Sequence, residues 1–405
     1  MRDPENPLIP SLTNKLLGLL AVAAGLTVAN NYYNQALLVE IGLEFRLTAP
    51  SAGGIAVATQ LGFASGLLLL VPLGDKFNRK TLILASAGAA TLASIAVALS
   101  PGIIFALAAS YFLGLVCITP QLIVPYAANL ARPERRGRAV GIVMSGLLIG
   151  ILFSRSVAGF LGHWLGWREV FGFGAAVTLL IALALCALPS SAPSSHPLSY
   201  AELLCSLGPL LAREPILRRH ALLGALGFGA FSAFWTTLAF YLAARPEHFG
   251  SDMVGIFGLV AVAGATAAPV SGRLSDRFSA RVVNGNSLAL MTGAFLLMLL
   301  ADRSLLWLGV GVFLMDAGTQ GSHISNQTRI YGLAPELRNR VTSIYMVISF
   351  LGGAAGSALA ASAWAKWHWP GVCVLGAGLA AIALGVLLYG TRKQTNFQGS
   401  HSRLQ

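Results

Sequence analysis

Long runs of apolar residues are the feature that most constrains the fold of this chain. A helix needs about 20 mainly apolar residues to cross a bilayer, and about twelve runs approach that length. In the first half they lie near residues 16–38, 52–72, 81–99, 102–130, 138–162 and 169–189. In the second half they lie near residues 221–243, 252–271, 283–301, 304–332, 341–363 and 370–390. The runs do not alternate like the strands of a membrane barrel, so the pattern predicts an all-α membrane protein with twelve transmembrane helices.

The composition excludes a soluble protein of this size. Of the 405 residues 56% are hydrophobic and only 10% are charged, whereas soluble domains carry about 25% charged residues. A net charge of +12 could indicate nucleic acid binding in a soluble protein. Here the basic residues lie in short loops between apolar runs, which indicates membrane topology and no nucleic acid partner.

Two loops occur twice, about 200 residues apart. Residues 71–80 (VPLGDKFNRK) correspond to 272–281 (GRLSDRFSAR), and 133–138 (PERRGR) correspond to 335–340 (PELRNR). The repeats predict two pseudo-symmetric six-helix bundles. We expect an N-terminal bundle at 1–189, a cytoplasmic linker at 190–219, and a C-terminal bundle with a short tail at 220–405. Leucines at helical spacing within 200–212 predict either a helix on the membrane surface or an ordinary connecting helix.

The distribution of basic residues predicts that both termini are cytoplasmic, because cytoplasmic loops are enriched in lysine and arginine. With that orientation the opposite loops hold only Arg46, Arg168, Arg245, Arg303 and Lys366. The cytoplasmic loops and ends hold Lys76, Arg79, Lys80, Arg132, Arg135, Arg136, Arg138, Arg273, Arg277, Arg281, Arg338, Arg340, Arg392 and Lys393.

Small residues in two symmetry-related runs predict close helix packing. They are Gly141, Gly146, Gly150 and Gly159 in the fifth run and Gly352, Gly353 and Gly356 in the eleventh. The four cysteines, at 117, 186, 205 and 373, form no CxxC pair. We interpret them as small core residues with no metal or disulfide role.

The chain resembles the major facilitator superfamily of secondary transporters over nearly its whole length. The signature loop between its second and third spans is matched by Leu73, Asp75, Lys76, Arg79 and Lys80, and the second copy keeps Gly272, Leu274, Asp276 and Arg277. Val71 and Asn78 replace the two signature glycines. The resemblance implies that these loops gate the cytoplasmic side. We expect Asp75 and Asp276 at cytoplasmic helix ends, near Arg138 and Arg340 or the positive start of a following helix.

Other stretches resemble the bacterial drug and sugar efflux branch, in which proton antiport is common. They are residues 31–38 (NYYNQALL), 121–126 (QLIVPY), 167–168 (WR) and 325–329 (SNQTR). Ser110 stands where proton-coupled exporters often have an arginine, and the proline-containing motif of antiporter span five is missing. The resemblance implies a location in the bacterial inner membrane.

The tenth run carries the most polar face. Asp316, Gln320, His323 and Gln327 recur at i, i+4, i+7 and i+11, which places them on one side of a helix. Asp316 comes about 18 Å along the run, near the middle of the membrane. Ionisable groups at that depth are commonly functional, so we predict that Asp316 couples transport to protons and that His323 relays or senses the proton. The alternatives are a neutral buried aspartate and a hydrogen-bonded core histidine.

The superfamily resemblance implies that spans one, four, seven and ten line a central cavity. The candidates for contact with the solute are Asn31, Tyr32, Gln35, Gln121, Trp235, Gln320, Asn326 and Gln327. Helix–helix hydrogen bonding and aromatic core packing are the alternative roles for these side chains. Arg155, inside the fifth run, has Ser357 as its symmetry mate and needs a buried partner, for which Asp316 and Glu40 are candidates.

Together these features predict a secondary transporter that exports a small organic solute by alternating access, in exchange for protons. A sugar or metabolite exporter without strict proton coupling is the alternative in the same class. A membrane enzyme or a sensor without transport activity on the same fold is the alternative in another class. The sequence has no P-loop, HExxH or GxSxG motif, so we expect no enzyme, cofactor or metal, and a monomer in the lipid bilayer.

Overall fold

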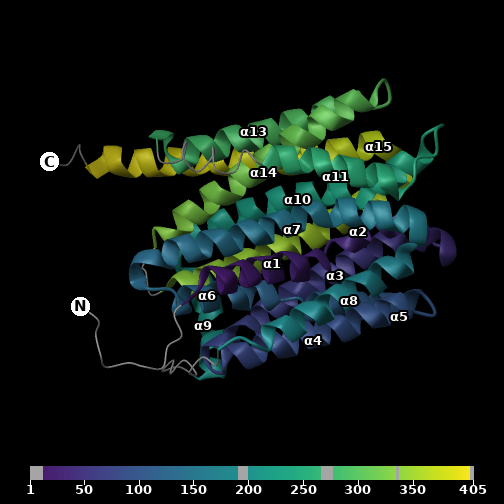
Figure 1. Ribbon diagram of the computed structural model, residues 1–405. Coiled ribbons are helices and arrows are strands. Elements are labelled where there is room, and N and C mark those ends of the chain that lie inside the picture. Colours follow the sequence, from purple (N-terminus) through teal and green to yellow (C-terminus); the bar gives the residue numbers. More distant parts are fainter. Residues whose placement is uncertain (1–11, 190–198, 266–276, 334–336, 402–405) are drawn as a thin grey trace.

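The computed structural model describes residues 12–189, 199–265, 277–333 and 337–401 (Figure 1). Its elements are, in chain order, α1 (Asn14–Ala29), α2 (Tyr33–Glu44), α3 (Ala49–Leu69), η1 (Val71–Asp75), α4 (Arg79–Ala98), α5 (Ile103–Val116), α6 (Thr119–Leu130), η2 (Pro133–Arg135), α7 (Arg136–Leu165), α8 (Trp167–Leu185), α9 (Tyr200–Arg213), α10 (Pro215–Ala244), α11 (Ser251–Ala265), α13 (Ala280–Met298), α14 (Leu305–Tyr331) and α15 (Arg338–His401). Within these residues the structure is helical, which confirms the predicted fold class.

The helices account for the twelve predicted spans. In the first bundle α1 with α2, and α5 with α6, each form one interrupted span, beside α3, α4, α7 and α8. In the second bundle α15 contains two spans that turn at His368, where φ is +51°, beside α10, α11, α13 and α14. Eight segments of the described chain are long and apolar enough to cross a membrane on those criteria alone. The polar face of α14 explains why it is absent from that group, although it has 27 residues.

The helices run between two ends of the molecule. We call the end that carries α9 the linker side, at the left of Figure 1, and the opposite end the far side. The first bundle meets the second where α3 packs on α15 and where α7 packs on α11. Toward the far side these contacts are close, since a Cβ at Gly159 would meet the backbone of Ser251 and Gly255. A Cβ at Gly53 of α3 would lie 2.8 Å from the Cβ of Ala361.

Most of the predicted glycine contacts are confirmed, and they join helices backbone to backbone. Gly146 and Gly150 of α7 approach the backbone of α1, where a Cβ at Gly150 would meet the carbonyl oxygen of Gly25. Gly352 and Gly356 approach the backbone of α10 in the same way. The expectation for Gly141 is wrong, because no atom of a neighbouring helix lies within 4 Å of a Cβ built there. Gly141 is exposed and lies five residues before Gly146, about 140° around the helix, so it faces away from α1.

The expectation that the cysteines lie in the core is confirmed for two residues and wrong for two. Cys117 and Cys373 are buried, whereas Cys186 and Cys205 are exposed. Cys186 caps the end of α8, and Cys205 lies on the outer face of the amphipathic α9. Both side chains are exposed because one lies at the end of its helix and the other on a helix face that does not pack on the core.

Helix α9 crosses the linker side and contacts both bundles. Ser199 and Glu202 cap its start by a reciprocal pair of hydrogen bonds of 3.2 and 2.6 Å. Its buried Leu207 packs with Ile330 of α14 and Val341 of α15. The Tyr200 hydroxyl donates to the carbonyl oxygen of Leu69, 2.7 Å away, at the end of α3. The apolar face of α9 therefore packs on protein.

Candidate functional site

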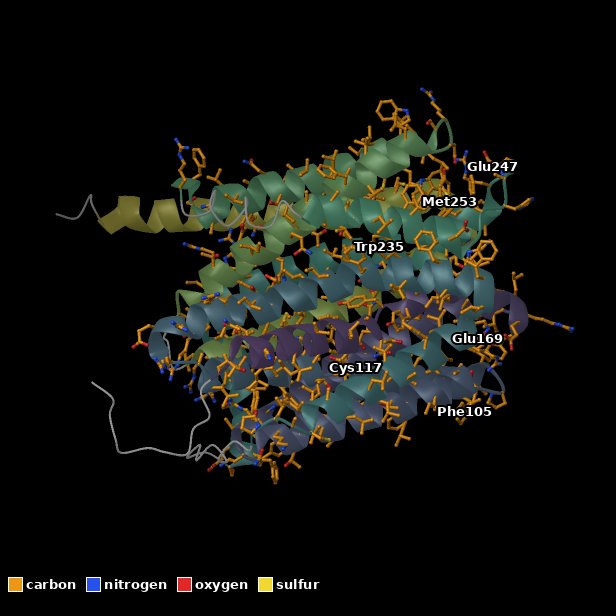
Figure 2. All side chains as sticks on the ribbon, viewed as in Figure 1. Phe105, Cys117, Glu169, Trp235, Glu247 and Met253 are labelled. Carbon is orange, nitrogen blue, oxygen red and sulfur yellow. The ribbon has the colours of Figure 1, made fainter. Side chains whose placement is uncertain are left out.

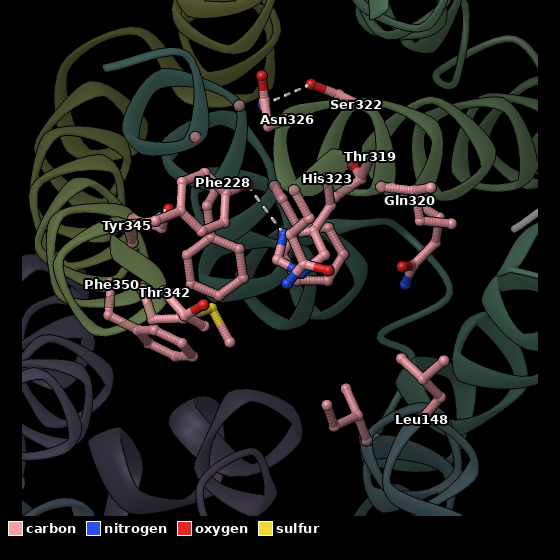
Figure 3. Close-up of a pocket in the computed structure, with 18 of the residues that line it drawn as sticks. Leu148, Phe228, Thr319, Gln320, Ser322, His323, Asn326, Thr342, Tyr345 and Phe350 are labelled. Atoms are coloured by element: carbon pink, nitrogen blue, oxygen red, sulfur yellow. Dashed lines mark hydrogen bonds between the residues drawn. The ribbon is translucent and has the colours of Figure 1, made fainter. Parts of the chain in front are cut away.

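A cavity of about 270 Å³ lies between the two bundles in the linker-side half of the molecule (Figure 3). It reaches the linker-side surface at Tyr331, which is 36% exposed. Its walls come mainly from Met144–Ile151 of α7, Leu223–Phe231 of α10, Thr319–Tyr331 of α14 and Thr342–Phe350 of α15. Val28, Tyr32, Phe63, Gln121, Val124 and Met291 complete the lining.

One wall of the cavity is aromatic. Phe63 of α3 packs on Phe350 of α15 with ring centroids 4.6 Å apart, and Phe350 packs on Phe228 of α10 at 4.7 Å. Phe228 stacks on Phe231 at 5.5 Å. The rings come from both bundles, so any motion of one bundle against the other rearranges this wall.

A polar part of the cavity wall belongs to α14. Gln320 and His323 lie there (Figure 3), together with Gln327, as their helical spacing predicts. The Gln327 amide nitrogen donates to Nε2 of His323 over 3.1 Å. The other ring nitrogen, Nδ1, then carries the proton and donates to the Tyr345 hydroxyl, 3.0 Å away. The imidazole is thereby fixed as one neutral tautomer.

Sequence reasoning missed a buried polar network behind this wall. Asn326 of α14 accepts hydrogen bonds of 2.8 Å from His220 of α10 and Asn284 of α13 through its Oδ1. Ser322 donates to Oδ1 of Asn284 over 2.8 Å. The available signal was a histidine directly before the seventh apolar run and two asparagines, Asn284 and Asn286, at the start of the ninth, since buried polar groups require partners.

Arg155 of α7 is fully buried beyond the inner end of the cavity. Its Nε donates to Oε1 of Gln35 on α2, 2.8 Å away. Its guanidinium lies over three rings, with Cζ 4.9 Å from the centroid of Tyr32, 5.2 Å from Phe231 and 4.3 Å from Trp235. Figure 2 shows Trp235 midway along the molecule. The first bundle's arginine is therefore held partly by aromatic residues of the second.

Asp316 is the other fully buried charged residue of this region. It is the twelfth residue of α14, and neither of its carboxylate oxygens has a hydrogen bond partner. The backbone of α11 passes close by, because a Cβ at Gly264 would lie 3.1 Å from the Cβ of Asp316. Arg155 and Asp316 lie near enough for their charges to attract each other. Of the two partners that we considered for Arg155, Asp316 is the one whose charge acts on it, although no hydrogen bond joins the two side chains.

The structure brings most of the predicted cavity residues together. Tyr32, Gln121, Gln320, His323, Asn326 and Gln327 line the cavity. The cavity lining does not include Asn31, Gln35, Trp235 or Asp316. Gln35 and Trp235 instead contact Arg155. Asn31 lies in the interruption between α1 and α2, buried and without a hydrogen bond partner for its amide.

The predicted gating residues lie at the linker side, as far as the structure describes them. Arg79 begins α4 and donates from Nε to the carbonyl oxygen of Gly74, 3.0 Å away. Lys76 follows η1, Arg138 is exposed in the first turn of α7, and Arg277 lies 5.4 Å from the ring centroid of Phe278. Arg340 donates to the Ser206 hydroxyl of α9 over 3.5 Å. Asp276 and the side chain of Asp75 lie outside the described residues, so their expected contacts stay predictions.

Known proteins resemble the chain over most of its length. It is 42% identical to YgaY, an uncharacterised transporter of Escherichia coli K12, over 97% of this chain and 99% of that protein. It is 28% identical to a chloramphenicol resistance protein of Streptomyces lividans, over 85% of this chain and 88% of that protein.

Solved structures share the fold. The nucleoside transporter NupG superposes with a TM-score of 0.78 at 14% identity, covering 92% of this chain and 99% of that one. A bacterial homologue of the human lysosomal transporter Spinster, in an inward-facing conformation, gives 0.73 at 15% identity, covering 93% and 96%. The model of the Major Facilitator Superfamily matches residues 19–357 and 235–403. With two bundles around a cavity between them, the chain belongs to the Major Facilitator Superfamily of membrane transporters.

Proposed function

We propose that this protein is a secondary active transporter that exports a small organic solute by alternating access, in exchange for protons. The observation that carries the proposal is Asp316, a buried carboxylate without a hydrogen bond partner, whose charge attracts the buried cation of Arg155. It lies one helical turn from Gln320, which lines the cavity between the bundles. Burial favours the neutral form of a carboxylate and a nearby cation favours the charged form. A motion that changes the distance between the two groups therefore changes proton affinity, which is the requirement for coupling.

The shape of the molecule supports alternating access. The cavity opens to the linker side, whereas α7 with α11 and α3 with α15 pack closely toward the far side. The linker-side helix ends and loops carry Lys76, Arg79, Lys80, Arg132, Arg135, Arg136, Arg138, Arg277, Arg281 and Arg340. Because basic loops face the cytoplasm, we propose that the linker side is cytoplasmic and that the conformation is inward-open.

The direction of transport is supported by one relative. The Streptomyces lividans protein is named for chloramphenicol resistance, which is consistent with removal of a small organic compound from the cell. We also propose that the protein is a monomer in the bacterial inner membrane. We propose that it consists of a bundle at 1–189, a linker at 190–219 and a second bundle at 220–405. His323, held by Gln327 and Tyr345 in the cavity wall, is the second group in the proposed proton path.

The test is solute uptake into inverted membrane vesicles, driven by a pH gradient. Asp316→Asn keeps the size of the side chain but cannot exchange a proton, so we expect it to abolish proton-driven flux and to leave solute binding or passive exchange intact. Glu134→Gln, at an exposed acidic residue of η2, is the control and should transport like the wild type. His323→Ala should shift the pH optimum. Accumulation against a gradient at the wild-type rate by Asp316→Asn would show that the coupling site lies elsewhere.

A further inference from the structure

We infer that the solute bound in this cavity is an uncharged amphiphile, with a flat apolar body and a group that forms hydrogen bonds. The inference rests on the proposed transport function and adds the chemical class of the substrate. It starts from the lining, which among the described residues contains no aspartate, glutamate, lysine or arginine. A charged solute would lose hydration there, at several kcal/mol, without an ionic partner in contact.

Aromatic walls often attract cations, but the position of Arg155 opposes this here. Tyr32 and Phe231 line the cavity and also lie against the guanidinium of Arg155, at 4.9 and 5.2 Å. A permanent positive charge therefore stands directly behind these rings. A cationic solute stacked on their cavity faces would experience repulsion between like charges, which works against the usual cation–π attraction.

An anion is disfavoured for a different reason. Arg155 is fully buried and is not among the residues that line the cavity, so its guanidinium offers an anion no contact there. Asp316, whose charge attracts that of Arg155, has the same sign as an anionic solute. The polar groups of the lining are neutral donors and acceptors, among them the amides of Gln320 and Gln327 and the imidazole of His323.

The two walls define the shape of the ligand. Phe63, Phe350, Phe228 and Phe231 form a continuous apolar surface that fits a ring or another flat body. Another part of the wall, on α14, offers amide and imidazole groups to a hydroxyl, amide or carbonyl group. The volume of about 270 Å³ is at the lower end of small-molecule sites. A compact compound with one apolar face and one polar face satisfies both walls.

The experiment measures equilibrium binding to the full-length protein in lipid nanodiscs, with sets of compounds that share one body and differ in charge. One set is chloramphenicol, its deacylated amine and its hemisuccinate ester; another is 2-naphthamide, 2-naphthylmethylamine and 2-naphthoate. We expect the neutral member of at least one set to bind at least about tenfold more tightly than both charged members. Equal or tighter binding of a charged member in both sets, or no binding of either neutral compound at millimolar concentration, would overturn the inference.

Variants test the same idea without relying on one compound. Gln320→Glu adds a carboxylate to the polar wall and should move the preference toward the amine, whereas Gln320→Leu should not. Phe228→Ala should weaken binding of the neutral compound about tenfold, since stacked rings and buried area both contribute. Phe313→Ala is the matched control, because Phe313 is a 41% exposed phenylalanine on α14 that does not line the cavity.

Binding in nanodiscs requires no pH gradient, so the two proposals can fail separately. If the protein prefers a charged compound and its flux depends on Asp316, the inference of an uncharged substrate is wrong and the proposed proton coupling stands. If the neutral compound binds tightly and a pH gradient drives no flux, the proposed proton coupling is wrong and the inferred substrate class stands.

Discussion

Arg155 and its aromatic neighbours join the two bundles at mid-depth. We expect Arg155→Ala to lose transport or folding, because the truncation leaves Gln35 and Asp316 buried without this partner; losing one member of a buried charged pair typically costs about 3–5 kcal/mol. The measurement is expression and thermal unfolding in detergent, followed by flux. Arg303→Ala is the control, since Arg303 is exposed at the far side. Normal flux and stability in Arg155→Ala would show that the buried pair has no role.

The need for a partner of Arg155 is predictable from the sequence, but its surroundings are not. A single arginine inside an apolar run is visible directly, and so is Asp316. The rings of Tyr32, Phe231 and Trp235 reach Arg155 because residues from α1/α2 and α10 meet α7 across the molecule. Contacts at such separations depend on how the bundles dock, which helical periodicity does not encode. For the same reason, Trp235 was expected beside the solute and instead lies beside the arginine.

At the scale of the helices, close glycine packing sets the distance between α1 and α7. Gly150→Ala should lower the stability by about 1–3 kcal/mol, because its Cβ would meet the backbone of Gly25, which cannot move independently of its helix. Gly141→Ala, on the same helix but free of close contacts, should be neutral or stabilising. Thermal unfolding of both variants in detergent checks the difference. Equal melting temperatures would contradict the packing argument.

The sequence predicted the helices well and their interruptions poorly. Residues 16–38 read as one continuous span, yet α1 ends at Ala29 and α2 begins at Tyr33. Asn30, within the interruption, donates from Nδ2 to the Thr178 hydroxyl of α8, 2.9 Å away. This bond stabilises the interruption through a residue almost 150 positions later, so local propensity could not indicate it.

At the scale of the whole molecule, the capped start of α9 fixes a link between the bundles. Ser199→Ala should remove about 1 kcal/mol of helix stability, whereas Ser199→Asp should retain the cap. Amide hydrogen exchange over residues 200–206 should then quicken about fivefold in the alanine variant only. Unchanged exchange would mean that packing, and not the cap, holds this helix.

The same cap gives α9 a pH dependence with a definite sign. The backbone N–H of Ser199, followed by its side chain, lowers the pKa of the Glu202 carboxyl below its usual value. A carboxyl whose pKa is lower in the folded state stabilises that state above the ordinary pKa, and this contribution is lost as pH falls through the lowered pKa. The protection of residues 200–206, measured as exchange corrected for its intrinsic dependence on pH, should therefore fall in acid in the wild type. Glu202→Gln should be insensitive over the same range.

Two attachments of α9 fix a distance at the linker side. Tyr200 donates to the end of α3, Ser206 accepts from Arg340 at the start of α15, and the stretch of helix between these two residues is about 9 Å long. An α-helix keeps its length, so the two bundles cannot approach each other there while both hydrogen bonds are intact. Closure of the linker side requires one of the two bonds to break, and the free energy of the weaker bond then contributes to the barrier to closure. Helix α9 therefore acts as a rigid spacer that can detach from one bundle. Shortening it by whole turns should change the rate of transport while the substrate specificity stays the same.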